Sequence, residues 1–212
     1  MVGRSIARRY AWHLRARRDC VCQRGLSRAE LDRAQEHFGV VFPPVWCEVL
    51  RIVHPVAARY PTLNRDGVPY STEFPDWRIR NESATRDLID RPIEDVVLDV
   101  GQNAFWWKAW GAAPETLEER VARARHQLAS APRLTPLWSG TYVASTNGSP
   151  VFRIQQTEVN ITWLRFVDMI ADRPQQETQP YQVGDISFWS LLSGYSQYGP
   201  DSPFADLATR GF

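Results

Sequence analysis

The chain has 212 residues, of which 43% are hydrophobic and 12% aromatic, and its formal net charge is +1. This apolar content excludes an intrinsically disordered protein, and the length suffices for one well-buried core. No apolar run approaches the roughly 18 residues of a membrane span, and no apolar segment follows the early arginine pairs as in a secretory signal. Three cysteines are too few for a disulfide scaffold, so we expect a cytoplasmic protein.

The charged side chains are distributed unevenly along the chain. Residues 1–24 hold seven arginines and one acid, Asp19, which leaves 18 basic and 23 acidic side chains in the remainder, a net charge of −5. We therefore expect residues 1–25 to form a basic arm, either helical or disordered, attached to a mildly acidic domain. The domain should span residues 26–193, and a loosely ordered tail should follow over residues 194–212.

The arm has a helical pattern over residues 5–18, with apolar side chains along one stripe at Ile6, Tyr10 and Leu14. Its arginines alternate with Tyr10 and Trp12, a combination suited to neutralising phosphates and stacking on bases. Nucleic-acid association through the arm is therefore one hypothesis, and its candidate residues are Arg8, Arg9, Arg15, Arg17 and Arg18. No recognisable nucleic-acid module follows, and the apolar face is small for binding a membrane surface.

The first two helices of the domain have clear start and stop signals. Ser27 with Glu30 three residues later predicts a capping box, and Gly39 should end the helix. Pro43-Pro44 suit the first turn of a second helix, which His54-Pro55 should end or kink.

The middle of the chain changes character from turns to strands. Residues 60–90 are polar and rich in turn residues, with a short helix expected at 84–90. A strand is expected over 96–100, a turn over 101–103, and a second, aromatic strand over 104–110.

The aromatic strand is the most unusual feature of the sequence. At a period of two residues, one face would carry Trp106, Lys108 and Trp110, and the other Phe105, Trp107 and Ala109. Bulky rings on both faces indicate either a strand that is covered on both sides or a strand that offers one face to a partner. Both interpretations remain open at the level of the sequence.

The last part of the domain reads as one helix and a series of short strands. Pro114 should open an amphipathic helix whose inward residues are Leu117, Val121, Ala124 and Leu128. Asn147-Gly148 predicts a tight hairpin turn between two strands. The remaining elements are expected to be strands at 134–138, 141–144, 151–155 and 159–163, a short helix at 164–171 and a final apolar element at 186–192. The pattern predicts an α+β fold with a mixed, largely antiparallel sheet of hairpin-connected strands, packed by N-terminal and central helices.

Signatures of catalysis and of metal binding are weak. Cys20-Val21-Cys22 lacks the spacing and the second cysteine pair of structural zinc sites, and Cys47 with His54 does not supply that pair. The sequence has no G-x-S-x-G elbow, no Walker motif and no G-x-G-x-x-G loop. We therefore expect no catalytic residues, no metal and no cofactor, and a function in binding.

Several segments together resemble the SUKH superfamily, which groups fungal Smi/Knr-type regulators with many bacterial immunity proteins. The residues that carry the resemblance span about 26–192: Leu26-Ser27-x-x-Glu30 with Phe38-Gly39-Val40-Val41-Phe42-Pro43, Pro75-Asp76-Trp77-Arg78, Arg91-Pro92-Ile93-Glu94 through Trp110-Gly111 with Pro114, Pro132-Arg133-Leu134-Thr135-Pro136-Leu137 with Tyr142, Pro150-Val151-Phe152-Arg153-Ile154 with Gln156-Thr157-Glu158-Val159, and Ile186-Ser187-Phe188-Trp189. Residues 1–24 have no counterpart in the family. After Thr157, Glu158 and Asn160-Ile161-Thr162-Trp163 replace the family's aspartate and tyrosine–glycine pair.

The resemblance implies a non-enzymatic domain that binds a protein, often a toxin encoded in the neighbouring gene. On this basis the candidate partner-binding residues are Asp76, Trp77, Asp99, Asn103, Trp106 and Trp110. The net charge of −5 after residue 24 would favour a basic partner such as a nuclease toxin. A regulatory scaffold without a toxin partner is the alternative on the same fold, and neither the oligomeric state nor the partner's identity follows from the sequence.

Overall fold

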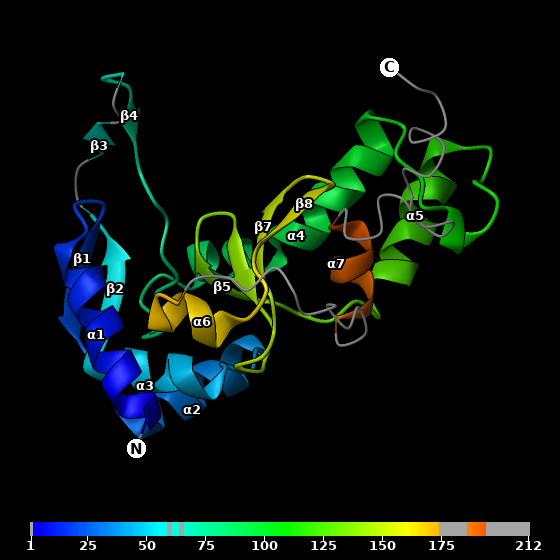
Figure 1. Cartoon of the computed structure of the whole chain (residues 1–212). Coiled ribbons are helices and arrows are strands. Elements are labelled where there is room, and N and C mark those ends of the chain that lie inside the picture. The colour runs from blue at the N-terminus through cyan, green and yellow to red at the C-terminus, as the bar shows by residue number, and fades with distance from the viewer. Residues whose placement is uncertain (1, 59–60, 64–65, 174–185, 194–212) are drawn as a thin grey trace.

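The computed structural model describes residues 2–58, 61–63, 66–173 and 186–193 (Figure 1). The helices of this part are α1 (Val2–Ala16), α2 (Arg28–Phe38), α3 (Pro44–Ile52), α4 (Glu82–Gln102), the 3-10 helix η1 (Lys108–Trp110), α5 (Leu117–Leu128), α6 (Phe166–Ala171) and α7 (Ser187–Leu192). The strands are β1 (Cys20–Arg24), β2 (Val53–Ala57), β3 (Thr62–Leu63), β4 (Pro69–Tyr70), β5 (Thr135–Trp138), β6 (Thr141–Val143), β7 (Val151–Gln155) and β8 (Glu158–Trp163). The α+β class is confirmed.

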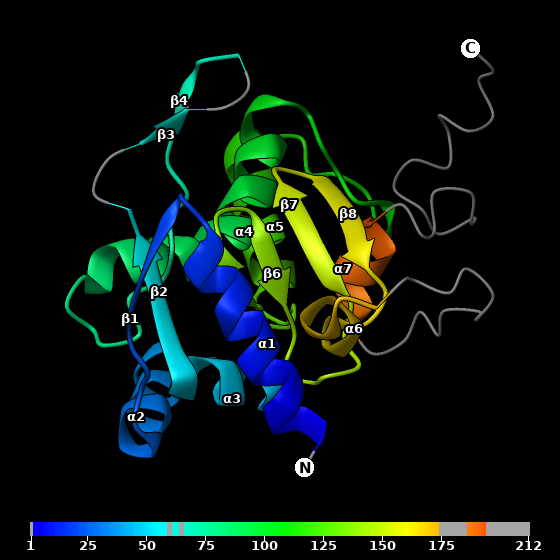
Figure 2. The same cartoon turned by 60° about the vertical axis from the view of Figure 1, so that its left-hand side comes forward.

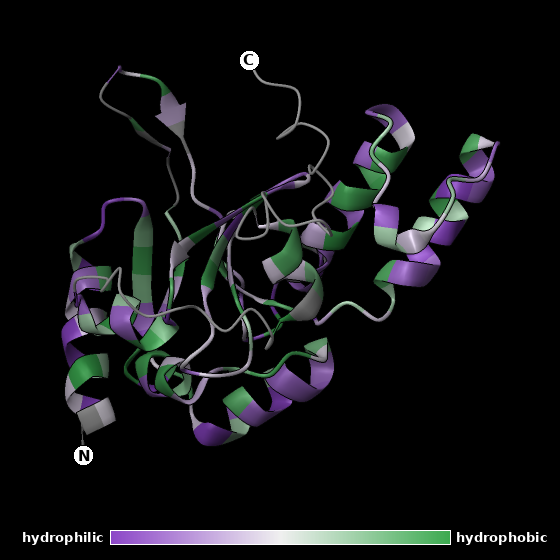
Figure 3. Ribbon diagram, turned by 45° about the vertical axis from the view of Figure 1, so that its right-hand side comes forward, coloured by the Kyte–Doolittle hydropathy of each residue, from purple (hydrophilic) through white to green (hydrophobic). Residues whose placement is uncertain are grey.

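The molecule is built in three layers around the four-stranded sheet β5-β6-β7-β8, in which every pair of neighbours is antiparallel (Figures 1 and 2). Alternate side chains of a strand point to opposite faces, so each face supplies its own core. Leu137, Val143 and Val151 pack with α1, α2, α3 and α6. Tyr142, Phe152 and Ile154 pack with α4, α5 and α7. Hydrophobic residues accordingly concentrate along the sheet and on the helix sides that face it (Figure 3).

Helix α1 packs onto the body of the protein. Ala7, Ala11 and Leu14 recur at helical spacing and are buried against α3 and α6. The helical interpretation of this segment is therefore confirmed, and the described part of it is a packed helix instead of a disordered arm. Its small alanines let α1 approach α3 closely.

The signals at α2 and α3 are confirmed in atomic detail. Ser27 Oγ accepts a hydrogen bond from the Glu30 N–H at 3.2 Å, and the Ser27 N–H donates to Glu30 Oε2 at 2.7 Å. Gly39 ends α2 with φ of 63°, the left-handed conformation that favours glycine. His54-Pro55 lies just beyond the end of α3, in strand β2, which pairs with β1. Neither strand was predicted from the sequence.

The helix expected at 84–90 is confirmed but was predicted too short, and the strands expected at 96–100 and 104–110 were wrong. A single helix, α4, replaces the expected short helix and the expected strand at 96–100. Its buried residues follow the helical period through and beyond Pro92, at Leu88, Ile89, Pro92, Val96, Val97 and Val100. Residues 104–110 form a loop and then η1 instead of an aromatic strand, so the two-face pattern expected for Trp106 and Trp110 does not exist.

The later elements follow the prediction with two corrections. The four strands of the sheet, α6 and the apolar element α7 are confirmed. Helix α5 begins after Thr116, whose hydroxyl accepts from the Glu119 N–H, instead of at Pro114. Leu117, expected to face inward, is 49% exposed. The tail over residues 194–212 lies outside the described residues.

The turn expected at Asn147-Gly148 was also wrong, although β6 and β7 do pair. Neither residue has a positive φ, so this is not the two-residue turn that the dipeptide favours. The connection is longer, and Asn147 uses its polar groups elsewhere. Its Oδ1 accepts from the Val45 N–H at the start of α3, and its backbone oxygen accepts from the Val167 N–H in α6.

Candidate protein-binding surface

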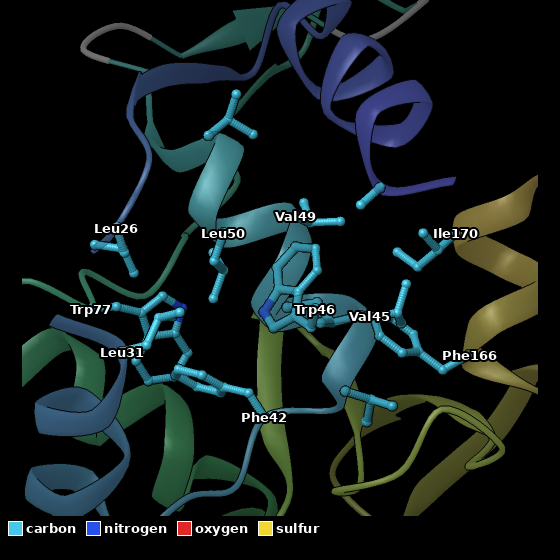
Figure 4. Close-up of a cluster of buried hydrophobic side chains, with 14 of the residues drawn as sticks. Leu26, Leu31, Phe42, Val45, Trp46, Val49, Leu50, Trp77, Phe166 and Ile170 are labelled. Atoms are coloured by element: carbon cyan, nitrogen blue, oxygen red, sulfur yellow. The ribbon is translucent and has the colours of Figure 1, made fainter. Parts of the chain in front are cut away.

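Trp77, a predicted partner-binding residue, lies inside the first core. It is 1% exposed, and its ring meets those of Phe38 and Phe42 edge-on at centroid distances of 5.8 and 4.7 Å. Figure 4 shows Trp77 beside Leu31 and Phe42. Because it is covered on all sides, Trp77 stabilises the fold and presents no surface to a partner.

Asp76 holds the turn that places Trp77. Its carboxylate accepts from Arg80 Nε at 2.9 Å and from the Arg78 backbone N–H at 3.1 Å. Burial alone would raise the pKa of Asp76, but these hydrogen bonds outweigh burial and lower it. Ile79, in the same turn, has φ of 62°, a strained conformation for a β-branched residue. The Asp76 hydrogen bonds therefore keep a strained turn closed.

A polar cluster beneath this turn connects α2, β1 and β2 through hydrogen bonds from Arg78. Arg78 donates to Glu30 at 2.9 Å, to the Arg24 carbonyl at 2.7 Å and to His54 Nδ1 at 3.0 Å. His54 is fully buried, and burial, reinforced by Arg78 and opposed by Asp76, lowers its pKa to about 4. The ring is neutral at neutral pH. Each polar group of this cluster is occupied by a partner, which is the arrangement of a structural junction.

The second group of predicted residues lies at the C-terminal end of α4, where Asp99 fixes the β7–β8 turn. Asp99 is 3% exposed. Its carboxylate accepts from Asn103 Nδ2 at 2.6 Å, from the Thr157 N–H at 2.8 Å and from the Thr157 hydroxyl at 2.7 Å. Asp99 thus acts inside the fold, whereas Asn103 lies on the surface as the cap of α4.

The tryptophans around η1 line the core that α4, α5 and α7 form with the sheet. Trp107 and Trp110 are buried, and both rings contact Phe188 of α7, at centroid distances of 4.5 and 6.4 Å. Trp106 is half-buried and donates its indole N–H to the Gly111 carbonyl at 2.8 Å. The structure therefore separates the six predicted positions into two places. Partner binding by the more exposed Asn103 and Trp106 stays a prediction.

The arginines of the first segment divide into two sets. Arg17 pairs with Asp19 and lies over the ring of Trp138 at 4.9 Å, and Arg9 donates to the Ala171 carbonyl at the end of α6. These two arginines stabilise the packing of the segment on the body. Arg8, Arg15 and Arg18 are exposed.

A cavity of about 260 Å³ between α4 and α5 was not foreseen from the sequence. Its third wall is the segment 131–134, and Trp189 of α7 closes one side by donating its indole N–H to the Pro132 carbonyl at 2.7 Å. The apolar lining consists of Ile89, Pro92, Ile93, Leu128, Ala129, Ala131, Pro132, Leu134 and Trp189. The signal that would have revealed it is the helical spacing of Ile89, Pro92 and Ile93, which is visible only if the helix is read through Pro92.

The charged groups that line this cavity form two ion pairs. The two terminal guanidinium nitrogens of Arg125 donate hydrogen bonds to the two carboxylate oxygens of Glu94, at 2.6 and 2.7 Å. Arg133 forms an ion pair with Asp90 at 3.2 Å. The hydrogen bonds from Arg125 lower the pKa of Glu94. Each carboxylate is paired with an arginine, so the cavity combines apolar side chains with two ion pairs and suits an apolar side chain that is flanked by polar groups.

Comparison with known proteins identified no relative of this chain: no protein-family model, curated protein or solved structure matches it. None of the described helices combines the length with the hydrophobicity that a membrane span requires. The residues that the structure describes contain no group of three or more His, Cys, Asp or Glu side chains placed to hold a metal ion.

Proposed function

We propose that this chain is a non-enzymatic protein-binding domain of the immunity type, which neutralises a toxin by binding to it. The observation that carries this proposal is the cavity between α4 and α5, which apolar side chains and two ion pairs line together. The partner inserts an apolar side chain into the cavity, and the surrounding charged groups contact the rim of the interface.

The size of the cavity favours a side chain over a larger ligand. Pockets for drug-sized molecules usually enclose about 300–1,000 Å³, and this cavity encloses about 260 Å³. Full burial of one Leu or Phe side chain contributes about 1.5–3 kcal/mol. One such anchor is typical of the few residues that carry most of the energy of an interface.

Charge and sequence resemblance support a basic toxin as the partner. The chain after residue 24 has a net charge of −5, which accelerates encounters with a basic protein such as a nuclease. The resemblance to the SUKH superfamily points to the same class of partner.

Co-expression with the product of the neighbouring gene, followed by affinity capture and a toxicity assay, tests the proposal. Ala129 lines the cavity, is exposed and has helical dihedrals, so Ala129→Trp should fill the pocket without unfolding the protein. Ala122→Trp, at an exposed position on α5 outside the lining, is the matched control.

We expect Ala129→Trp to weaken capture at least tenfold and to abolish protection, and Ala122→Trp to do neither. Equal binding by both variants would refute the cavity as the site. Capture of the neighbouring product without protection from toxicity would instead identify a regulatory scaffold.

A further inference from the structure

The solvent-facing side of α1 is a basic surface that the cavity and the sheet do not use. Ala7, Ala11 and Leu14 bury an adjoining stripe of the helix in the core, so the exposed side has a fixed orientation. We define the α1 basic face by four residues, Arg4, Arg8, Trp12 and Arg15. All four are exposed.

The four residues lie close together on the helix surface. Arg8 and Trp12 are four residues apart, and Arg15 follows Arg8 by two turns, so their side chains project to the same side of the helix. At a rise of about 1.5 Å per residue, Arg4 and Arg15 are separated by about 16 Å along the axis. The face therefore presents a row of cations long enough to follow several phosphates of one strand.

Little negative charge opposes this row. The helix contains no acidic residue between Val2 and Ala16. Glu48 lies 3.7 Å from Arg4, but the Arg4 side chain is 75% exposed, and surface pairs of this kind contribute little. Arg8 and Arg15 thus give this face a positive potential on a chain whose remaining residues carry a net negative charge.

Trp12 adds a feature that electrostatics alone does not require. Its side chain is 65% exposed, although tryptophan is normally buried. The indole meets the His13 ring edge-on, at 5.3 Å and 76°. An exposed indole beside guanidinium groups is the arrangement on which an unpaired base stacks while arginines contact the adjoining phosphates.

Two other polyanions fit this face less well. The bases of a duplex are stacked on one another, so Trp12 would gain no base from it. A helix that binds a membrane inserts its apolar side into the lipid, and the apolar side of α1 is buried in the core.

We propose that the α1 basic face binds single-stranded nucleic acid, with Arg4, Arg8 and Arg15 contacting phosphates and Trp12 stacking on an unpaired base. This site is formed by residues that do not line the α4–α5 cavity, and it goes beyond the proposed toxin binding.

Fluorescence anisotropy of the full chain with a labelled twelve-residue oligothymidylate measures this binding directly. With three arginine–phosphate contacts, the slope of log K against log salt should be about −2, because each contact with a single strand contributes about −0.7. Arg8→Ala with Arg15→Ala should reduce the slope to about −0.7. Trp12→Ala should weaken binding roughly 5-fold to 140-fold, the effect of losing one base–aromatic stack.

The matched control removes two exposed arginines from α2, Arg28 and Arg33, which lie on a helix that also carries three acidic residues. This variant should bind like the parent chain. All substitutions are at exposed positions, and a thermal melt of each variant confirms that it is folded.

Parallel titrations with a duplex of the same length and with vesicles containing anionic phosphatidylglycerol separate the alternatives. Tighter binding of the single strand, with loss in the Trp12 variant, supports the proposal. The proposal fails if the duplex binds equally well and Trp12→Ala has no effect, if only vesicles bind, or if the α2 control loses as much affinity as the α1 variant.

Discussion

Asp99 offers a quantitative test of whether the α4 carboxylate serves the fold or a partner. Replacing Asp99 by alanine removes the acceptor of three hydrogen bonds, two from Thr157 and one from Asn103. If Asp99 stabilises the β7–β8 turn, the free energy of unfolding must fall. If Asp99 served only to bind a partner, its replacement would leave the free energy of unfolding nearly unchanged.

The size of the loss follows from the donors left without a partner. A buried donor without an acceptor costs about 1–3 kcal/mol. Asn103 is exposed and can donate to water instead, so the two donors of Thr157 dominate. Thr157 is half-buried, so each of its donors should cost an amount near the lower limit, and we expect Asp99→Ala to lower the free energy of unfolding by about 2–3 kcal/mol. Thr157→Ala, which removes only the hydroxyl, should cost about 1–2 kcal/mol.

Urea unfolding followed by tryptophan fluorescence, applied to the two single variants and the double variant, isolates the contact. The coupling energy between Asp99 and Thr157 should be about 1–2 kcal/mol, because a hydrogen bond to a charged group is stronger than a neutral one. Glu158→Ala, at the exposed next position, is the control and should have little effect. A coupling energy below about 0.5 kcal/mol would refute the structural role.

Two further predictions concern the burial of Trp77 and Trp106 and the protonation of His54. Trp77→Ala should lower the free energy of unfolding by about 3–5 kcal/mol, whereas Trp106→Ala, at a half-buried position, should cost about 1–2 kcal/mol; equal losses in urea unfolding would contradict the assigned burial. Because burial lowers the pKa of His54 from 6.5 to about 4, the unfolded chain binds a proton in this window that the folded chain does not. Stability should therefore decrease by up to about 3 kcal/mol as the pH falls from 6.5 to 4. His54→Gln should flatten this dependence, and an unchanged pH profile would contradict it.

Local signals in the sequence predicted local structure well. The capping box of Ser27 and Glu30, the left-handed Gly39 and the helix start at Pro44 depend on contacts within a few residues. The strands of the four-stranded sheet were also found, because short apolar runs between turn residues mark hairpins.

The segment 84–110 shows where local signals fail. The helix expected at 84–90 ended before Pro92, yet a proline inside a helix is tolerated when the surrounding packing compensates for the lost hydrogen bond. Valines and tryptophans favour strands only weakly, and the burial of Val96 and Val100 against α5 and the sheet overrides that preference. The error placed Trp106 and Trp110 in a strand, whereas Trp106 lies in a loop and Trp110 in η1.

The sequence by itself determined the α+β class, the caps of α2 and the order of the hairpin strands, because neighbouring residues fix backbone dihedrals and periodicity. Only the tertiary structure decided that Trp77 and Asp99 are buried, that α4 and α5 enclose a cavity, and that α1 turns its arginines and Trp12 toward solvent. Each of these features joins residues that are distant in the chain. Their burial depends on how whole elements pack, which no local pattern records.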